Sequence, residues 1–218
     1  MNVPDLILLG PQGSGKTTQA EFLSRNFGFS LIGAGNVLRE IARGNTESAE
    51  TVHRTINVEG HLIEPELISE LMKEKIMAVP KDRRLILDGY PRTLTQYKLF
   101  KEFWPETGRK EYRAIFVDIP REEAITRLAH RVTCENCGAV FSEGTTEKCP
   151  DCSGRLSRRD DDTPNAIQNR LQSFYSETMP MIRTMEADGK VLHLDGMQTA
   201  DRLHRDIVAR LFGRVGKT

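Results

Sequence analysis

Residues Gly10 to Thr17 read G-P-Q-G-S-G-K-T and directly follow the apolar run Leu6–Leu9. This is the pattern G-x-x-x-x-G-K-[ST] in its usual setting, where a short buried strand turns into a helix. Gly13 and Gly15 let the backbone N–H groups surround an anion, and the N-terminus of the following helix adds its partial positive charge. The stretch therefore predicts a phosphate-binding P-loop.

Two side chains of this stretch carry the chemistry. We expect Lys16 to reach the terminal phosphates and the Thr17 hydroxyl to ligate Mg²⁺. A chance glycine-rich turn is the alternative. Such a turn would not be expected to lie between a buried strand and a helix, and here a helix is expected from Thr17 to Phe27. The sequence therefore predicts that the chain binds a nucleoside triphosphate.

Composition limits the other classes of function. The chain has 218 residues, with Lys plus Arg equal to Asp plus Glu at 31 each, so its formal net charge is zero. This length suits one principal domain with small insertions, and a balanced charge argues against a broad basic face for nucleic acid. No apolar run approaches the length that crosses a bilayer. We expect a cytoplasmic protein that acts as a monomer and binds neither nucleic acid nor membrane.

Short apolar runs alternate with helical patterns along most of the chain. Runs of this kind are typical of strands buried on both faces of a parallel sheet. Alternating strands and helices predict a doubly wound α/β fold of the P-loop NTPase type, with a five-stranded parallel sheet flanked by helices and ligands at the carboxyl ends of the strands. The predicted strands are Leu6–Leu9, Ser30–Ile32, Leu85–Leu87, Ala114–Ile119 and Val191–Leu194.

Two insertions interrupt this rhythm. Residues 34–63 have a polar, helical pattern without a strand, and residues 127–164 carry the cysteines and many turn-forming residues. The core is therefore expected to comprise 1–33, 64–126 and 165–218. After the second insertion, a single long helix is predicted from Pro164 to Ala187, kinked at Pro180 because proline removes one backbone hydrogen bond.

The second insertion contains two C-x-x-C pairs, Cys134 with Cys137 and Cys149 with Cys152, separated by eleven residues. Two such knuckles can close a tetrahedral Zn²⁺ site. Four thiolates would leave no open position for water, so the zinc is expected to be structural. Redox chemistry at one C-x-x-C pair, or four free thiols, is the alternative. The acidic run 160–162, between Arg158, Arg159 and the next helix, is expected to form ion pairs at the hinge of this module.

A second phosphate site is predicted where residues 85–93 read L-I-L-D-G-Y-P-R-T. Asp88 ends a predicted buried strand, where a carboxylate would hold the water shell of Mg²⁺. Arg92 lies on the adjacent loop, and its planar guanidinium suits bidentate contact with a phosphate.

Several of these stretches together resemble the adenylate kinase family, in its long form with a zinc-bearing lid, over essentially the whole chain. The likeness rests on Gly10–Thr18, on Asp88–Thr93 with Gln96, and on the arginine pair Arg127 and Arg131. It implies a cleft shared by two nucleotides, with the second insertion as a lid over ATP and the first as a flap over AMP.

The resemblance also implies site residues. Arg39 aligns with the family's I-S-T-G-D-x-L-R stretch, and Arg159 and Arg170 align with its R-x-D-D and R-L motifs. The residues implied for ATP are Gly13, Ser14, Gly15, Lys16, Thr17, Thr18, Arg127, Arg131, Val140, Phe141 and Gln198. Those implied for AMP are Ala34, Arg39, His61, Leu62, Ile63, Gly89, Tyr90, Pro91, Arg92, Gln96, Arg159 and Arg170.

The reaction implied is Mg²⁺-dependent transfer from ATP to AMP, giving two ADP and balancing adenine nucleotides. The AMP phosphate is already anionic, so positioning and charge neutralisation are expected to suffice without a side-chain base. Arg127 and Arg131, four residues apart, are expected on one helix face. The residues expected to be catalytic are Lys16, Arg92, Arg127, Arg131, Arg159 and Arg170.

The acceptor base is less sharply indicated. Ala34 stands where adenylate kinases usually have Thr, as in UMP/CMP kinases, and Asn36 stands where Asp is usual, whereas Gln96 fits the AMP-selective pattern. A UMP/CMP or broad-specificity nucleoside monophosphate kinase is therefore an alternative. A nucleic-acid-binding zinc-ribbon ATPase, or a GTPase switch, is a more distant one, against which stand the balanced charge and the absence of an N-K-x-D guanine motif.

Overall fold

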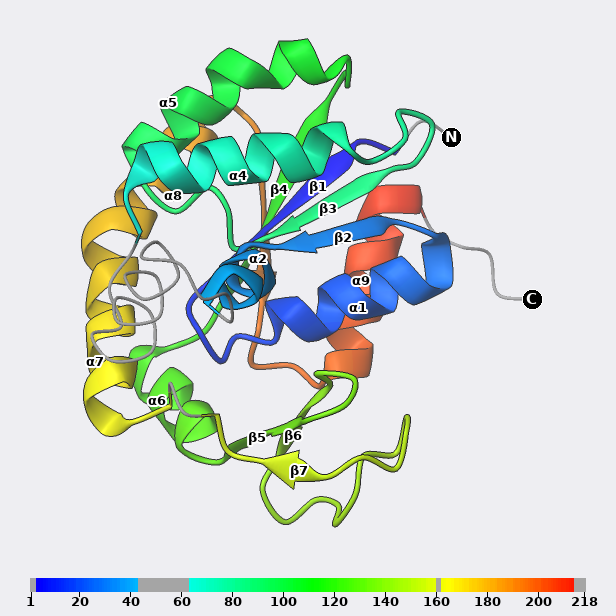
Figure 1. Ribbon diagram of the computed structural model, residues 1–218, viewed down its shortest axis with the longest axis vertical. Helices are drawn as coiled ribbons and strands as arrows, with labels where there is room; N and C mark the ends of the chain where they lie inside the picture. Colours follow the sequence, from blue (N-terminus) through cyan, green and yellow to red (C-terminus); the bar gives the residue numbers. More distant parts are fainter. Residues whose placement is uncertain (1–2, 43–62, 160–161, 214–218) are drawn as a thin grey trace.

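The computed structural model describes residues 3–42, 63–159 and 162–213, and its centre is a five-stranded sheet (Figure 1). All four strand pairings are parallel, and the strand order is β2-β3-β1-β4-β8. The predicted doubly wound α/β fold is confirmed, and every predicted strand is present with ends shifted by at most two residues. The strands are β1 (Asp5–Leu9), β2 (Ser30–Gly33), β3 (Leu85–Asp88), β4 (Tyr112–Asp118) and β8 (Val191–Asp195).

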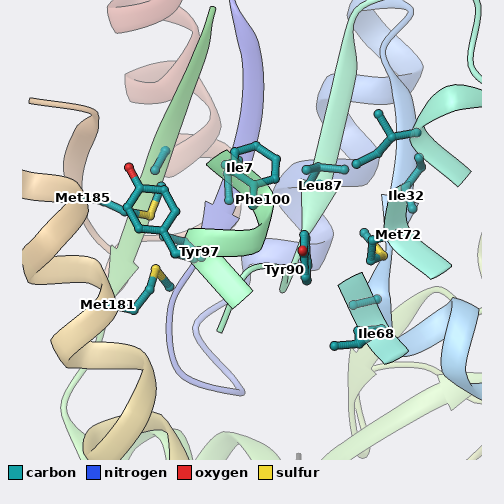
Figure 2. Close-up of a cluster of buried hydrophobic side chains, with 14 of the residues drawn as sticks. Ile7, Ile32, Ile68, Met72, Leu87, Tyr90, Tyr97, Phe100, Met181 and Met185 are labelled. Atoms are coloured by element: carbon teal, nitrogen blue, oxygen red, sulfur yellow. The ribbon is translucent and has the colours of Figure 1, made fainter. Parts of the chain in front are cut away.

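Helices cover both faces of the sheet and form two separate hydrophobic cores. On one side, Ile7 and Leu9 of β1 pack with α4, α5 and α8, as Figure 2 shows for Ile7, Phe100 and Met181. On the other side, Leu6 and Leu8 pack with α1 and α9. This alternation follows from the two-residue period of a strand, and it explains why β1 is apolar throughout. These helices are α1 (Lys16–Phe27), α4 (Pro65–Met77), α5 (Leu94–Phe103), α8 (Met179–Ala187) and α9 (Ala200–Phe212).

The two edge strands, β2 and β8, depart from the expectation that all five strands are buried on both faces. Ile32 is the one buried residue of β2, and Leu194 is the one buried residue of β8, which pairs only with β4. The side chain of His193 is 57% exposed. An edge position explains this difference, because fewer neighbouring elements cover the outer side of such a strand.

The segment from Pro164 to Ala187 is not one kinked α-helix as predicted. It consists of α7 (Pro164–Ser173), a π-helical segment η3 (Phe174–Thr178) and α8. Thr163 caps α7, because its side chain accepts a hydrogen bond from the backbone N–H of Ala166. The departure from α-helical geometry thus precedes Pro180 rather than starting there.

The two insertions differ in how much of them is described. The first begins with α2 (Ala34–Ala42), and residues 43–62 lie outside the described part of the chain. The second contains a separate antiparallel sheet of order β6-β5-β7, which follows α6 (Figure 1). The remaining elements are α6 (Arg121–Ala129), β5 (Arg131–Cys134), β6 (Val140–Ser142), β7 (Leu156–Ser157) and a short 3₁₀ helix, η2 (Trp104–Thr107).

One prediction about this second insertion is wrong. Arg127 and Arg131 do not share a helix, since α6 ends at Ala129 and Arg131 is the first residue of β5. Within β5, Val132 and Cys134 are buried and alternate with less buried residues. This two-residue period is the signature of a strand with one covered face, so the helix cannot continue through Arg131.

Among the described residues, no helix combines the length and the apolar character that a bilayer crossing requires.

Candidate functional site

The carboxyl ends of β1, β2 and β3 open into a cleft of ≈ 1300 Å³. Its walls come from the P-loop, α2, the loop after β3, the second insertion and α7. Most of the predicted site residues line it: Gly13, Gly15, Lys16, Thr17, Thr18, Ala34, Arg39, Ile63, Asp88, Gly89, Arg92, Gln96, Arg127, Arg131, Val140, Phe141, Arg159, Arg170 and Gln198. Residues predicted from distant parts of the sequence therefore meet in one cavity.

The P-loop forms one end of the cleft floor. Gly13 and Gly15 have φ angles of 85° and 89°, a conformation that glycine adopts without strain. A Cβ at Gly10 would lie 2.3 Å from the Val117 carbonyl oxygen, so only glycine fits between β1 and β4 there. Ser14 is buried below this floor, and its backbone N–H donates to the Pro11 carbonyl at 3.2 Å.

Lys16 donates from its Nζ to the Pro11 carbonyl at 3.1 Å, which keeps its ammonium group at the cleft floor. Burial lowers the pKa of Lys16 to about 8; the carboxylate of Asp88 opposes this shift, while the charges of Arg92, Arg131 and Arg159 add to it. Several cations therefore face one space, and an anion with multiple charges would relieve their mutual repulsion.

Asp88 and Thr17 meet beside Lys16. The Thr17 hydroxyl donates to Asp88 Oδ2 at 2.6 Å, and the other carboxylate oxygen, Oδ1, is buried without a hydrogen-bond partner among the described residues. An unpartnered buried carboxylate oxygen next to a hydroxyl is an oxygen donor set that suits Mg²⁺ and its water shell. These two residues therefore fit the metal that a bound triphosphate would bring.

Arg92 is held near Asp88 by hydrogen bonds to its own loop. Its Nε donates to the Gly89 carbonyl at 2.7 Å, and its backbone N–H donates to Gln96 Oε1 at 2.7 Å. Burial lowers the pKa of Arg92; Asp88 counteracts this, and the charge of Arg170 adds to it. The intrinsic pKa of arginine is so high that the guanidinium stays charged.

Further arginines converge on the cleft from α6, β5 and α7. Arg127 donates from NH1 to the carbonyls of Gly13 and Gly196 at 3.3 and 3.1 Å, and it pairs with Glu123 at 2.6 Å. It thus ties the P-loop to the loop after β8.

Asp162 joins two of these arginines. Arg131 contacts its carboxylate at 2.5 Å and Arg170 at 3.4 Å, and the Asp162 side chain is only 5% exposed. The expectation of ion pairs in this segment is met by Asp162, which pairs with Arg131 and Arg170, while the other two residues of the acidic run, 160 and 161, lie outside the described residues. Asp162 was not predicted as a site residue, because nothing in its local sequence points to Arg131, 31 positions away.

The side of the cleft next to α2 is less polar. Leu31, Leu38 and Ile68 line it together with Ile63, and these three apolar residues were not predicted as site residues. Asn36 Oδ1 accepts a hydrogen bond from Arg39 NH2 at 2.5 Å. A partly apolar wall of this kind suits a base or a ribose better than a phosphate.

Three predicted residues within the described part of the chain do not line the cleft: Ser14, Tyr90 and Pro91 are buried behind it. The Tyr90 hydroxyl donates to Ser69 Oγ at 2.9 Å. The predicted residues His61 and Leu62 lie outside the described residues.

The four cysteines of the second insertion come together. Their Sγ atoms all lie within 4.8 Å of one another, with Cys134 3.4 Å from Cys152 and Cys137 3.5 Å from Cys149. These separations exceed a disulfide bond of about 2.05 Å and approach the S–S edge of about 3.8 Å in a tetrahedral site with Zn–S bonds of about 2.3 Å. Four thiol ligands in this arrangement fit Zn²⁺.

A comparison with protein families agrees with this geometry. The family model described as adenylate kinase matches residues 8–190, which is most of the chain. The chain belongs to the adenylate kinase family. It is therefore a nucleoside monophosphate kinase.

Individual members of the adenylate kinase family support this membership. The chain is 33% identical over 212 residues to an adenylate kinase of Archaeoglobus fulgidus, covering 95% of this chain and 97% of the relative. It is 33% identical to one from Chlamydia pneumoniae, over 94% of this chain and 96% of the relative. It is 30% identical to one from Syntrophomonas wolfei, over 95% and 98% respectively.

In this member of the adenylate kinase family, the two loops predicted to bind phosphate follow neighbouring strands. The P-loop follows β1 and the Arg92 loop follows β3, and these strands pair directly, with Leu8 opposite Asp88. Both loops open into the same cleft, and the cysteine site lies at the small sheet of the second insertion, where Cys134 and Cys137 also line the cleft.

Proposed function

We propose that the protein catalyses reversible phosphoryl transfer from Mg²⁺-bound ATP to AMP, giving two ADP, and thereby balances adenine nucleotides. The observation that carries this proposal is that the P-loop and the Arg92 loop, at the carboxyl ends of the adjacent strands β1 and β3, line one cleft. A single-nucleotide ATPase or switch has no need for the second loop.

The donor triphosphate is proposed to lie along the P-loop. Backbone N–H groups of Gly13 to Thr18 and the start of α1 would surround its phosphates, with Lys16 neutralising the terminal ones. Thr17 and Asp88 would hold Mg²⁺, which supplies charge neutralisation across the phosphates when bound. Val140 and Phe141 from β6 would cover the donor from above.

The acceptor is proposed to bind beside Arg92. Arg92 and Arg39 would hold its phosphate, and the apolar wall near Ile63 would contact its base or ribose. Gln96 Oε1 accepts a hydrogen bond from the backbone N–H of Arg92, which fixes the orientation of the Gln96 amide group. The Nε2 atom of Gln96 then remains as a donor for a ligand. A donor at this place suits a ring acceptor atom of the base.

Transfer itself needs no side-chain base, because the attacking phosphate oxygen is already anionic. The residues proposed to act on the transferred group are Lys16, Arg92, Arg127, Arg131, Arg159 and Arg170, all cations that line the cleft. Their role would be to align the two phosphates and to balance the negative charge shared between them in the transition state. Closure of the second insertion would exclude water and so prevent hydrolysis of ATP.

The cysteine site is proposed to hold a structural Zn²⁺. Four thiolates would fill its coordination sphere, and the hydrophobic cluster around it is small, with Cys134, Ala139 and Cys149 as its buried members. A module with so little core needs a metal to hold its shape.

The chain is further proposed to act as a monomer. Its exposed large apolar residues within the described part of the chain are spread over α4, α5, α6, η3 and the loop before α9 rather than gathered on one face; they are Leu67, Met77, Leu94, Ile125, Tyr175 and Met197. Light scattering during size exclusion would test this.

A second candidate acceptor is a pyrimidine nucleotide. Ala34 has no hydroxyl group, whereas most adenylate kinases have Thr at this position. A coupled assay with ATP and, in turn, AMP, CMP, UMP and GMP decides between them. We expect kcat/KM to be highest for AMP. A preference for CMP or UMP would overturn the AMP proposal, and hydrolysis of ATP stimulated by nucleic acid without transfer would overturn the kinase proposal.

A further inference from the structure

Gln19 has a role that neither the P-loop nor the arginines require. It lies on α1, three residues after Lys16, and it is 1% exposed. Its Nε2 donates to the Ala200 carbonyl at 2.8 Å, and its Oε1 lies 3.2 Å from His204 Nδ1. A backbone carbonyl can only accept, so Nε2 is the donor, and Oε1 must accept from the histidine. Both ends of a buried amide are thus used between α1 and α9.

His204 fixes the orientation of this amide. Since its Nδ1 donates to Gln19, its Nε2 is left to accept, and Asn26 Nδ2 lies 3.4 Å away as the donor. Burial lowers the pKa of His204, with Asp201 opposing the shift, so the ring is neutral at neutral pH and can donate at one nitrogen while accepting at the other. The rings of Phe22 and Phe27 pack against it.

This series of hydrogen bonds ends at Ala200, the first residue of α9, directly after the loop that follows β8. Gln198 of that loop and Ala200 both line the cleft. Arg127 holds the beginning of the loop through the Gly196 carbonyl, and Gln19 holds its end through the Ala200 carbonyl. Figure 1 shows α1 crossing α9, with the P-loop leading into the first helix and the loop after β8 leading into the second. The loop is thereby fixed at two points relative to the P-loop.

We infer that Gln19 is a positioning residue for the donor nucleotide: it sets the distance between the P-loop, where the phosphates are proposed to bind, and residues 196–200, which line the cleft at Gln198 and Ala200 and would contact the base of the donor. His204 holds the Gln19 amide in the orientation that this requires. The inference depends on the proposed donor site but not on the identity of the acceptor. It assigns to α1 a function beyond its N-terminus.

The test compares two ligands that share phosphates but not a base. Titration calorimetry of the full-length protein with Mg²⁺ measures the Kd of ATP and of inorganic tripolyphosphate. Gln19→Met keeps the size of the side chain and removes both hydrogen bonds. We expect its Kd for ATP to rise about tenfold, which corresponds to the free energy of about one lost hydrogen bond. The Kd for tripolyphosphate should change less than about twofold, because this ligand has no base.

Ser24→Ala is the matched control. Ser24 lies on the same helix, and its hydroxyl donates to the Phe29 carbonyl at 2.7 Å, away from the cleft. This variant loses a comparable side-chain hydrogen bond of α1, and we expect it to leave the ratio of the two Kd values unchanged. The ratio separates a loss of positioning from a general loss of stability, because destabilisation alone affects both ligands alike.

His204→Ala gives a second, independent variant if Gln19→Met does not fold. It leaves Gln19 in place but frees the amide to rotate, and we expect Kd for ATP to rise about threefold, again without an effect on tripolyphosphate. An unchanged ratio in the folded variants, or an equal loss for both ligands, would overturn the inference. Transfer to AMP is measured separately on the wild type, so failure of the proposed acceptor leaves this ratio interpretable.

Discussion

Binding of ATP is expected to draw a proton onto Lys16 in a manner that depends on pH. Burial lowers the pKa of Lys16 to about 8, and the phosphates of a bound triphosphate would raise this pKa again. With a pKa of about 8, roughly nine-tenths of the Lys16 side chains are charged at pH 7 and roughly one-quarter at pH 8.5. Binding should therefore take up about 0.1 proton at pH 7 and about 0.8 proton at pH 8.5.

The same linkage sets the sign of the change in affinity. Only the charged form of Lys16 attracts phosphate, so affinity is greatest below pH 8 and decreases above it, with a Kd about tenfold higher at pH 9 than at pH 7. Phosphate groups with a second pKa of about 6 are fully ionised above pH 8 and contribute no uptake there. Calorimetry at pH 8.5, in two buffers that differ in ionisation enthalpy, measures the number of protons directly.

Lys16→Arg is the control, because arginine keeps its charge over this range. We expect this variant to take up nearly no proton at pH 8.5 while still binding ATP. If the wild type and Lys16→Arg took up the same number of protons, the uptake would belong to another group, and the assignment of a lowered pKa to Lys16 would be refuted.

The remaining predictions concern the metal site, the transfer and the fold. Chelation of the metal, or Cys134→Ser, should increase proteolysis within residues 131–157 while the far-ultraviolet circular dichroism of the core is retained; an unchanged digestion pattern would contradict a structural metal. Arg92→Ala should lower kcat about 10²–10³-fold with an intact fold, and turnover close to that of the wild type would contradict its catalytic role. Arg109→Met should lower the free energy of unfolding by about 3–5 kcal/mol, because it removes the ion-pair partner of the buried Asp5 carboxylate and leaves it, among the described residues, only the hydrogen bond from the Leu85 backbone N–H. Arg109 is 3% exposed and 3.3 Å from Asp5, and denaturant titration showing a loss below about 1 kcal/mol would contradict this.

The features that could be predicted from sequence are those with a local signature. The strand β1 and the P-loop are contiguous, so one stretch of residues contains the strand, the turn and the helix start. The cysteine pairs are likewise recognisable from their spacing, and the structure brings all four together. Each of these depends on residues whose neighbours in space are also neighbours in sequence.

The features that could not be predicted depend on contacts between distant segments. Arg131 is four residues after Arg127, a spacing that fits a helix. The segment is nevertheless a strand, because Val132 and Cys134 are buried in alternation with less buried residues in the small sheet. The pairing of Asp162 with Arg131 and Arg170 joins a hinge, a strand and a helix. Gln19 reads as an ordinary helix residue until α9 packs against it. Tertiary packing sets these roles, and no local pattern encodes them.

The π-helical segment η3 has a consequence for how this chain can tolerate changes in length. On its N-terminal side, Arg170 faces Asp162, and on its C-terminal side, Met181 and Met185 enter the core. An α-helix turns by about 100° per residue, so deletion of a single residue within 174–178 would rotate α7 by that angle relative to α8. Ile167 and Leu171 of α7 would then leave their buried positions, and Arg170 would turn away from the cleft. An insertion or deletion here would thus rotate α7 relative to α8. The π-helical segment η3 gives the two helices the relative rotation that directs α7 to the cleft and α8 to the core.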